Sequence, residues 1–254
     1  MNIVVFDTET TSVNKPFCYN IGYVIVDTET HNIVCKRDYV VEQVWHNPML
    51  FTTAYYADKR ALYVNRMRAR QVLMEKYGYI TQQLIRDIKA FNVEMAFAYN
   101  SPFDIGVFEY NCEWFKCNNP FDNIPIHDIR GFVHNFIANT QDYKDFCDKH
   151  EYYTESGNYS TTAETIYRYI TQNTEFIEEH TALADSEIEW EILEYCLEQG
   201  ADITIEYSVS RSISRNAPQT LEIIDNGTKH TYTYNSRRDY KNGSRVNKII
   251  LKNI

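Results

Sequence analysis

Three short acidic motifs and one histidine are the parts of this sequence best suited to chemistry. Asp7 and Glu9 stand at i and i+2 at the end of the apolar run 3–6, which predicts a buried strand. Both carboxylates should therefore face the same side of that strand. Two neighbouring carboxylates repel each other and are stable when cations lie between them. The pair is typical of a divalent metal site, although each acid alone is compatible with a purely structural role.

Two further acids and a histidine lie on predicted helices. Asp104 falls in the first turn of a helix expected over 103–115, which Pro102 opens. Asp185 falls on the apolar face of a helix expected over 181–199, and a carboxylate aimed at the core needs a partner or a metal. His180 lies just before that helix. A neutral histidine has an ordinary pKa of about 6.5 and can take a proton from an attacking water.

In this order and spacing the motifs resemble the DEDDh family of 3′→5′ exonucleases. This family (DnaQ-like) includes the DNA polymerase III epsilon-type proofreading subunits, RNase T and oligoribonuclease. The resemblance covers about residues 1–200 and is clearest over 5–11, 100–106 and 182–185. The five-residue step from His180 to Asp185 is similar to the histidine subclass. Ser12 and Tyr99 depart from the common pattern, where many relatives have Gly and His.

The resemblance implies a fold, a reaction and a set of roles. The implied fold is α/β and RNase H-like, with a mixed five-stranded sheet flanked by helices. The implied reaction releases nucleoside 5′-monophosphates from single-stranded 3′ ends, with DNA favoured and a replication or repair role, and a polymerase is a possible partner in trans. Two divalent ions, Mg²⁺ or Mn²⁺, would be held by four acids, with a histidine as general base: Asp7, Glu9, Asp104, Asp185 and His180. The residues expected to hold the terminal nucleotide are Thr10, Asn100 and Phe103.

Other local patterns predict the elements that would position these residues. Apolar runs at 3–6, 21–26 and 33–41 predict an antiparallel meander, and short strands are expected at 95–99 and 124–126. Helices are expected over 47–77, 80–91 and 161–171, and 141–160 is expected to be a loop. Asn226-Gly227 predicts a hairpin turn between 221–225 and 228–234. The repeated Asp-x-Glu at Asp27 and Glu29 is interpreted as a turn, and His127-Asp128 as a strand end and helix cap.

Composition limits the classes of protein. The chain has 254 residues, 44% of them hydrophobic, which is enough for a packed core. Its net charge of −10 excludes a uniformly basic coat protein. Residues 203–254 nevertheless carry nine basic and four acidic side chains. We therefore expect an exonuclease domain over 1–200 and a small basic, β-rich extension over 201–254, which either contacts a polyanion or is a solvated surface.

Cysteines and apolar segments indicate where the protein works. Six cysteines without any C-x-x-C make a zinc site or a disulfide framework improbable. No leader-like N-terminus and no apolar run of membrane-spanning length occur, so a soluble, cytoplasmic protein is expected.

Three alternatives stay open at this stage. The substrate could be RNA rather than DNA, because the choice depends on how the site treats the 2′-hydroxyl. The fold could serve as a catalytically silent module that tethers a polymerase or replisome partner. An integrase-like relative would cut internally. A basic stretch is expected either to guide the nucleic-acid backbone or to form a solvated face: Lys59, Arg60, Arg66, Arg68 and Arg70.

Overall fold

The structure is a computed structural model that describes residues 1–254 except 52–53, 55–56, 211, 216–218, 226–227 and 235–254. The chain forms two compact units. The first comprises residues 1–152 and 160–211, and the second comprises 153–159 and 212–254. No helix among the described residues combines the length and the apolar content needed to cross a membrane.

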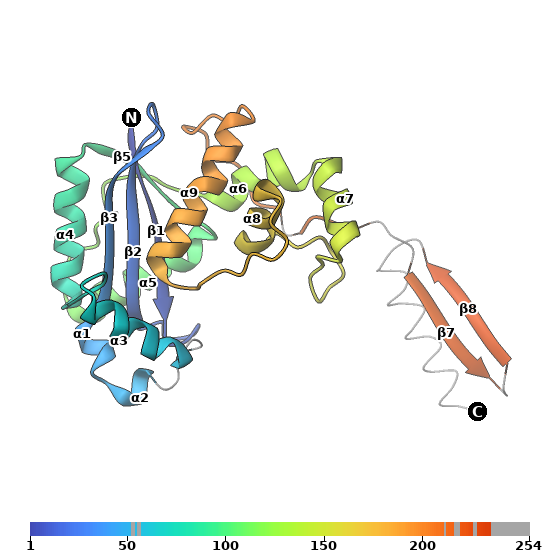
Figure 1. The fold of residues 1–254 in the computed structure, drawn as a ribbon, viewed down its shortest axis with the longest axis horizontal. Coiled ribbons are helices and arrows are strands. Elements are labelled where there is room, and N and C mark those ends of the chain that lie inside the picture. The colour runs from blue at the N-terminus through green and yellow to red at the C-terminus, as the bar shows by residue number, and fades with distance from the viewer. Residues whose placement is uncertain (52–53, 55–56, 211, 216–218, 226–227, 235–254) are drawn as a thin grey trace. The chain divides into compact units, whose positions relative to one another are not determined.

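A mixed sheet of six strands in the order β4-β3-β2-β1-β5-β6 is the frame of the first unit (Figure 1). The strands are β1 (Asn2–Thr10), β2 (Cys18–Asp27), β3 (Asn32–Val41), β4 (Leu73–Glu75), β5 (Val93–Ala98) and β6 (Ile126–Asp128). β1 pairs antiparallel with β2 and parallel with β5, so it lies inside the sheet. The α/β fold with a mixed sheet is confirmed. The expected count of five strands is wrong by one, because the three residues of β4 add a parallel edge strand next to β3.

Helices cover both faces of this sheet. They are α1 (Glu42–Trp45), α2 (Pro48–Phe51), η1 (Ala57–Lys59), α3 (Arg60–Arg68), α4 (Tyr77–Ala90), α5 (Ser101–Phe115), α6 (Ile129–Val133), η2 (His134–Ala138), α7 (Gln141–His150), α8 (Ala163–Thr171) and α9 (Ala182–Glu198). α9 packs across β1 and β2 on one face. Val4 and Phe6 point to the opposite face and join the core that α4 and α5 cover. Alternate residues of β1 therefore supply the two layers, as the pleat requires.

The single helix expected over 47–77 is wrong. This stretch contains α2, η1, α3 and then β4, and α3 ends where Arg70 adopts a left-handed φ of 58°. A helix cannot continue through that conformation at low cost. Leu73–Glu75 instead complete the edge of the sheet beside β3.

The loop expected over 141–160 is wrong in its first half, which forms α7. The Thr140 side chain accepts the Tyr143 N–H and caps this helix. Tyr143, Phe146 and Cys147 are its buried residues. The aromatic side chains thus form an inward face, whereas the many polar residues between them suggested a loop.

The second unit is described by itself. Tyr159 forms an isolated antiparallel bridge with Ile213, and Arg215 lies 4.1 Å from the ring centre of Tyr153. β7 (Gln219–Asp225) and β8 (Thr228–Tyr234) pair antiparallel, which confirms the hairpin, while the turn residues Asn226 and Gly227 lie outside the described residues. The expected domain division at residue 200 stays a prediction.

Candidate active site

The end of β1 gathers three of the four predicted metal ligands. Asp7 and Glu9 come from β1 and Asp185 from α9, and one carboxylate oxygen of each lies within 4.8 Å of the other two. Glu9 and Asp185 are buried, whereas Asp7 is partly exposed. This acidic cluster (Asp7, Glu9 and Asp185) can therefore be reached from solvent on the Asp7 side.

A glycine in β2 allows α9 to come this close. Gly22 pairs with Asp7 across the β1–β2 ladder. A Cβ at Gly22 would lie 2.0 Å from the backbone nitrogen of Leu183, in the first turn of α9. Any larger residue would push this turn away from the sheet. The missing side chain at Gly22 thus fixes how near Asp185 can lie to Asp7.

Asn20, also in β2, holds the first residue of α9. Its Oδ1 accepts the Ala182 N–H at 2.9 Å and the Tyr63 hydroxyl at 2.8 Å. Its Nδ2 donates to Asp38 Oδ1 at 2.6 Å. An N–H in the first turn of a helix has no partner within the helix, so a fixed side-chain acceptor determines where α9 begins. Asp185 follows one turn later.

Asp104 lies next to the cluster but outside the group of oxygens within 4.8 Å. It is buried in the first turn of α5, and its Oδ1 accepts the Thr8 hydroxyl at 2.6 Å. Burial raises the pKa of Asp7 well above its usual range, and the charge of Asp104 is the next largest cause. The four predicted acids therefore share one electrostatic site, and three of them share one coordination-sized space.

Burial and mutual repulsion make this site unfavourable for negative charge. Burial raises the pKa of Glu9 to about 8, although the charge of Lys59 opposes this. Burial also raises the pKa of Asp185 to about 9 and that of Asp104 to about 7. Asp185 Oδ1 is buried without a hydrogen-bond partner. A cation would remove the repulsion and occupy this oxygen, so the residues present fit a divalent metal.

Glu189 is a fifth carboxylate at the site that sequence reasoning missed. It lies four residues after Asp185 on α9, is buried, and its Oε2 accepts the Tyr99 N–H at 3.1 Å. Burial, followed by the charges of Asp104 and Asp185, raises the pKa of Glu189 well above its usual range. The signal was available, because residues at i and i+4 share a helix face. Its backbone contact ties α9 to the end of β5, just before α5.

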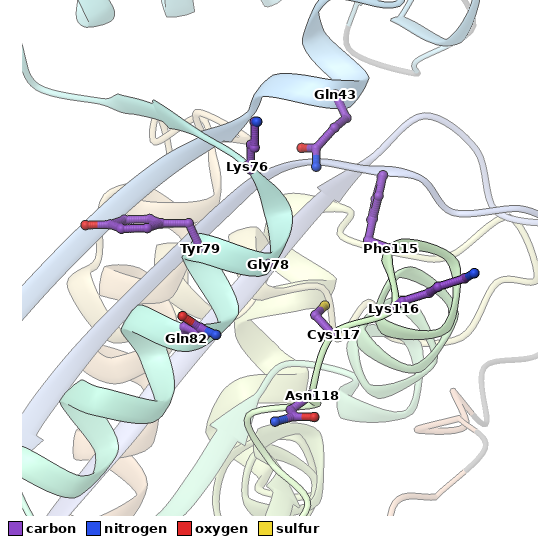
Figure 2. Close-up of a pocket in the computed structure, with 9 residues that line it drawn as sticks. All are labelled: Gln43, Lys76, Gly78, Tyr79, Gln82, Phe115, Lys116, Cys117 and Asn118. Carbon is purple, nitrogen blue, oxygen red and sulfur yellow. The ribbon is translucent and has the colours of Figure 1, made fainter.

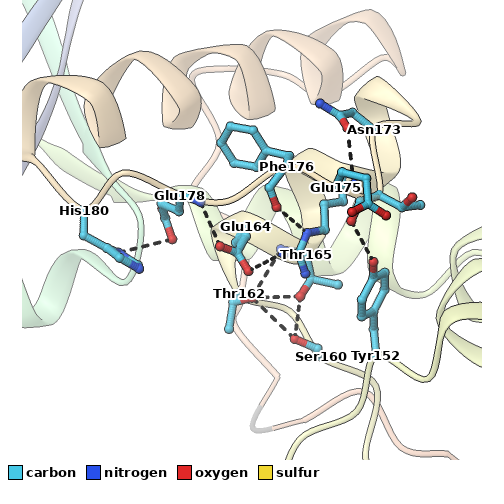
Figure 3. A network of polar contacts seen from close by, with 12 residues as sticks. Tyr152, Ser160, Thr162, Glu164, Thr165, Asn173, Glu175, Phe176, Glu178 and His180 are labelled. Atoms are coloured by element: carbon cyan, nitrogen blue, oxygen red, sulfur yellow. Dashed lines mark hydrogen bonds and ion pairs between the residues drawn. The ribbon is translucent and has the colours of Figure 1, made fainter.

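His180 belongs to a second group beside the acidic cluster. Its Nδ1 lies 3.6 Å from Glu178 Oε2, and the Glu178 backbone N–H donates to Glu164 Oε2 at 2.8 Å (Figure 3). Arg168 pairs with the other Glu164 oxygen at 2.9 Å. His180 has a left-handed φ of 54°, which is unusual for a residue with a side chain.

Electrostatics connect the two groups. Burial and the charge of Lys59 lower the pKa of His180, so the imidazole is neutral at neutral pH. After burial, the charge of Glu178 is the largest cause that raises the pKa of Asp185. The histidine group is therefore close enough for its charges to act on the acidic cluster.

Part of the basic stretch holds the histidine segment in place. Lys59 Nζ donates to the His180 carbonyl at 3.4 Å. Arg66 donates to the Thr181 hydroxyl at 3.1 Å and pairs with Glu179 at 2.6 Å. Arg60 lies 5.2 Å from the ring centre of Trp45. These contacts explain why the cations of α3 do not form a single free face.

The residues expected to hold the terminal nucleotide lie around the same strand end. Thr10 is the last residue of β1 and donates to the Ser12 carbonyl. Asn100 precedes α5 in a left-handed conformation, and its Oδ1 accepts from Arg130 at 2.9 Å. Phe103 is partly exposed and packs against the core beneath α5. Their roles in binding stay predictions.

The two patterns interpreted as structural behave as expected. Asp27 accepts the Glu29 N–H at 3.0 Å within the β2–β3 turn. Asp128 ends β6 and caps α6 by accepting the Arg130 N–H at 2.9 Å.

Comparison with known proteins bears on the fold. No family model and no curated protein sequence matches the chain. Among solved structures, the nuclease domain of 3′hExo, a DEDDh family member bound to rAMP, matches with a TM-score of 0.54 at 12% identity and covers 84% of this chain and 97% of its own. A full-length 3′-exonuclease matches with a TM-score of 0.55 at 13% identity, over 91% of this chain and 90% of its own. A 3′-exonuclease described in 3′-end specific recognition of a histone mRNA stem-loop matches with a TM-score of 0.54 at 12% identity and the same coverage.

The chain therefore has the fold of a DEDDh exonuclease domain, which confirms the fold expected from the resemblance. At these identities the similarity concerns the fold alone.

Proposed function

We propose that this protein is a metal-dependent 3′→5′ exonuclease that hydrolyses the terminal phosphodiester of single-stranded nucleic acid. The observation that carries the proposal is the acidic cluster. Its three carboxylates lie within 4.8 Å of one another in a fold shared with DEDDh exonucleases. Such mutual repulsion is costly for a purely structural site, and it is useful where cations must be held.

Asp7, Glu9 and Asp185 would hold one divalent ion, and Asp104 beside Asp7 would help to hold a second. Carboxylate oxygens suit Mg²⁺ and Mn²⁺. When bound, two such ions would supply positive charge on both sides of the attacked phosphate. The Thr8 hydroxyl donates to Asp104 Oδ1 and so fixes the position of that carboxylate.

His180 is the proposed general base. Because its lowered pKa keeps the imidazole neutral, it can accept a proton from the attacking water at neutral pH. Glu178 Oε2 lies 3.6 Å from Nδ1. Burial raises the pKa of Glu178 to about 7, and its ionised form would favour the protonated ring once the proton has been taken. The opposite ring nitrogen, Nε2, would then face the water.

Two substrates fit this proposal. The family resemblance leads us to favour DNA, and RNA is the alternative. The structural matches bound to rAMP and described with a histone mRNA stem-loop support testing RNA with equal weight. A polymerase partner acting in trans stays a prediction.

A gel assay with matched 5′-labelled single-stranded DNA and RNA tests the proposal. With Mg²⁺ or Mn²⁺ we expect a ladder that shortens from the 3′ end, and no ladder with EDTA. Asp7→Ala should abolish it, while Glu29→Gln, which removes an acid from the exposed β2–β3 turn, should leave it unchanged. A folded wild-type protein that yields no ladder on either strand would overturn the proposal and favour the silent binding module.

A further inference from the structure

An aromatic hollow lies at the sheet edge where β1 ends. Its volume is about 410 Å³. The first residues of β2 and the last residues of β3 also lie here, because β2 runs antiparallel to both β1 and β3. Phe17 precedes β2, Leu50 lies on α2, and Trp114 lies near the end of α5, and all three line the hollow. Trp114 is 61% exposed, although tryptophan side chains are highly buried on average.

The exposed tryptophan is held by its neighbours rather than free to rotate. The Phe17 ring meets Trp114 edge-on at 5.1 Å and Tyr110 edge-on at 5.3 Å. Tyr110 and Trp114 stack with an interplanar angle of 23°. A rigid aromatic face is therefore presented to solvent, and ordering it on binding costs little conformational entropy.

A basic hollow of about 500 Å³ adjoins the aromatic one (Figure 2). The two share Gln43 and Phe115. Lys76 at the start of α4 and Lys116 just after α5 line the basic hollow, and both are exposed. Among the described residues, no acidic side chain lines either hollow, although the whole chain carries a net charge of −10. Glu113, beside Trp114, is exposed but is not a lining residue.

Helix α5 connects the aromatic hollow to the candidate active site. Phe103, Tyr110 and Trp114 stand at i, i+7 and i+11, which places them on one face of α5. Asp104, in the first turn, belongs to the site. Ten residues separate Asp104 from Trp114, or about 15 Å along the helix axis. Between them Gly106 leaves open space, since a Cβ there would meet no atom within 4 Å.

We propose that these two hollows bind the single strand upstream of its 3′ end, with a base stacked on Trp114 and phosphates near Lys76 and Lys116. This inference rests on the proposed function for the position of the 3′ end. Aromatic faces accept any base, and lysines attract the backbone. At about 3.4 Å per stacked nucleotide, 15 Å corresponds to roughly four nucleotides from the scissile phosphate. A dinucleotide would reach the acidic cluster without reaching Trp114.

Intrinsic fluorescence reports on this contact directly. Trp114 is exposed, whereas the other two tryptophans, Trp45 and Trp190, are 4% and 3% exposed. In EDTA, which stops turnover, an oligothymidylate dodecamer should quench the fluorescence of the full-length protein, and a dinucleotide should not. Equal quenching by both, or none by the dodecamer, would overturn the inference.

Variants separate stacking from charge. By anisotropy of a 5′-labelled dodecamer, Trp114→Leu should weaken binding by on the order of tenfold, and Trp114→Phe should largely restore it. Leu73→Ala, which removes an exposed apolar side chain on β4, is the matched control. Lys76→Ala with Lys116→Ala should lower the salt dependence of binding by a slope of about 1.4, whereas Lys149→Ala on α7 should not.

Kinetics distinguish failure of this inference from failure of the proposed function. With metal, Trp114→Leu should raise KM for the dodecamer and leave cleavage of a dinucleotide unchanged. If the Trp114 variant cleaves with full activity and binds the dodecamer as tightly as the wild type, the proposed binding at the two hollows is refuted and the exonuclease proposal stands. If binding of the dodecamer depends on Trp114 but the wild-type protein cleaves nothing, the exonuclease proposal is refuted and the proposed binding at the two hollows stands. If Trp114 instead mediates self-association, seen by sedimentation without the oligonucleotide, a second copy covers the surface and the inference fails.

Discussion

Removing one negative charge from the acidic cluster should change stability and activity in opposite directions. Burial raises the pKa of Asp7, and so do the negative charges of Asp104, Glu189, Asp185 and Glu9, which repel it. Asp7→Asn should therefore raise the melting temperature of the metal-free protein and abolish cleavage. Differential scanning fluorimetry in EDTA measures the first effect and the gel assay the second. Loss of both stability and activity would indicate a purely structural aspartate.

Metal should stabilise the wild type, and the effect should grow with pH. The carboxyl pKa values near 7, 8 and 9 lie above those of the unfolded chain, so the folded state without metal binds more protons than the unfolded state. Its stability should then fall as pH rises from about 4 to 9. Mn²⁺ or Mg²⁺ should remove most of this fall in the wild type and little of it in Asp185→Asn. A metal shift in melting temperature that is equal at pH 5 and pH 8 would contradict the assignment.

His180 and Glu178 should differ in how they affect the reaction. His180→Gln should lower kcat by about 10²–10⁴ with folding retained, since it removes the proton acceptor. Glu178→Gln should keep activity but shift the acidic limb of the pH–rate profile to lower pH, because no carboxylate 3.6 Å from Nδ1 would then favour the protonated imidazole. An unchanged profile would show that Glu178 only packs against the neighbouring loop.

Asp7, Glu9, His180 and Asp185 could be predicted from sequence alone because chemistry-bearing motifs are local. Asp7 and Glu9 are two residues apart, and His180 and Asp185 are five apart. Glu189 and Glu178 were not predicted, although the i, i+4 spacing places Glu189 on the same face of α9 as Asp185. Glu189 accepts from Tyr99, ninety positions away, and no local pattern encodes such a partner.

At the scale of elements, the contact between β2 and α9 leaves no room for a larger side chain at Gly22. Gly22→Ala would place a methyl group 2.0 Å from the Leu183 nitrogen, so α9 must move. We expect a loss of about 1–3 kcal/mol or more in unfolding free energy, with a large loss of activity. Gly106→Ala on α5 is the control, because its Cβ meets open space and alanine favours a helix. Chemical denaturation of the two variants makes the comparison.

The elements predicted best were mostly the longer ones. The meander β1–β2–β3, the helices α4, α5 and α9, and the hairpin β7–β8 were all expected within a few residues. The region 47–77 was not, since its breaks depend on Arg70 in a left-handed turn and on the sheet edge that β4 joins. The pairing of β4 with the edge of the sheet depends on tertiary contacts, and a strand of three residues is too short for its hydrophobic pattern to predict it.

At the scale of the whole molecule, the proposed reaction requires a free end. A covalently closed single-stranded circle should survive incubation that degrades the matched linear strand. An integrase-like enzyme would cut both. The comparison needs one gel, with the linear strand as its own control for activity, and nicking of the circle would contradict the exonuclease assignment.

The position of Asp185 has a consequence for how the protein is made. The cluster needs both β1 and α9, and α9 begins only at Ala182, long after β1 in the chain. Asn20 and Gly22 in β2 contact the first turn of that helix, and Asp185 lies on it. A nascent or prematurely terminated polypeptide that ends before α9 thus carries Asp7, Glu9 and Asp104 without a complete site. Such fragments should be inert toward the cell's own nucleic acids, and activity should appear only after α9 has been synthesised.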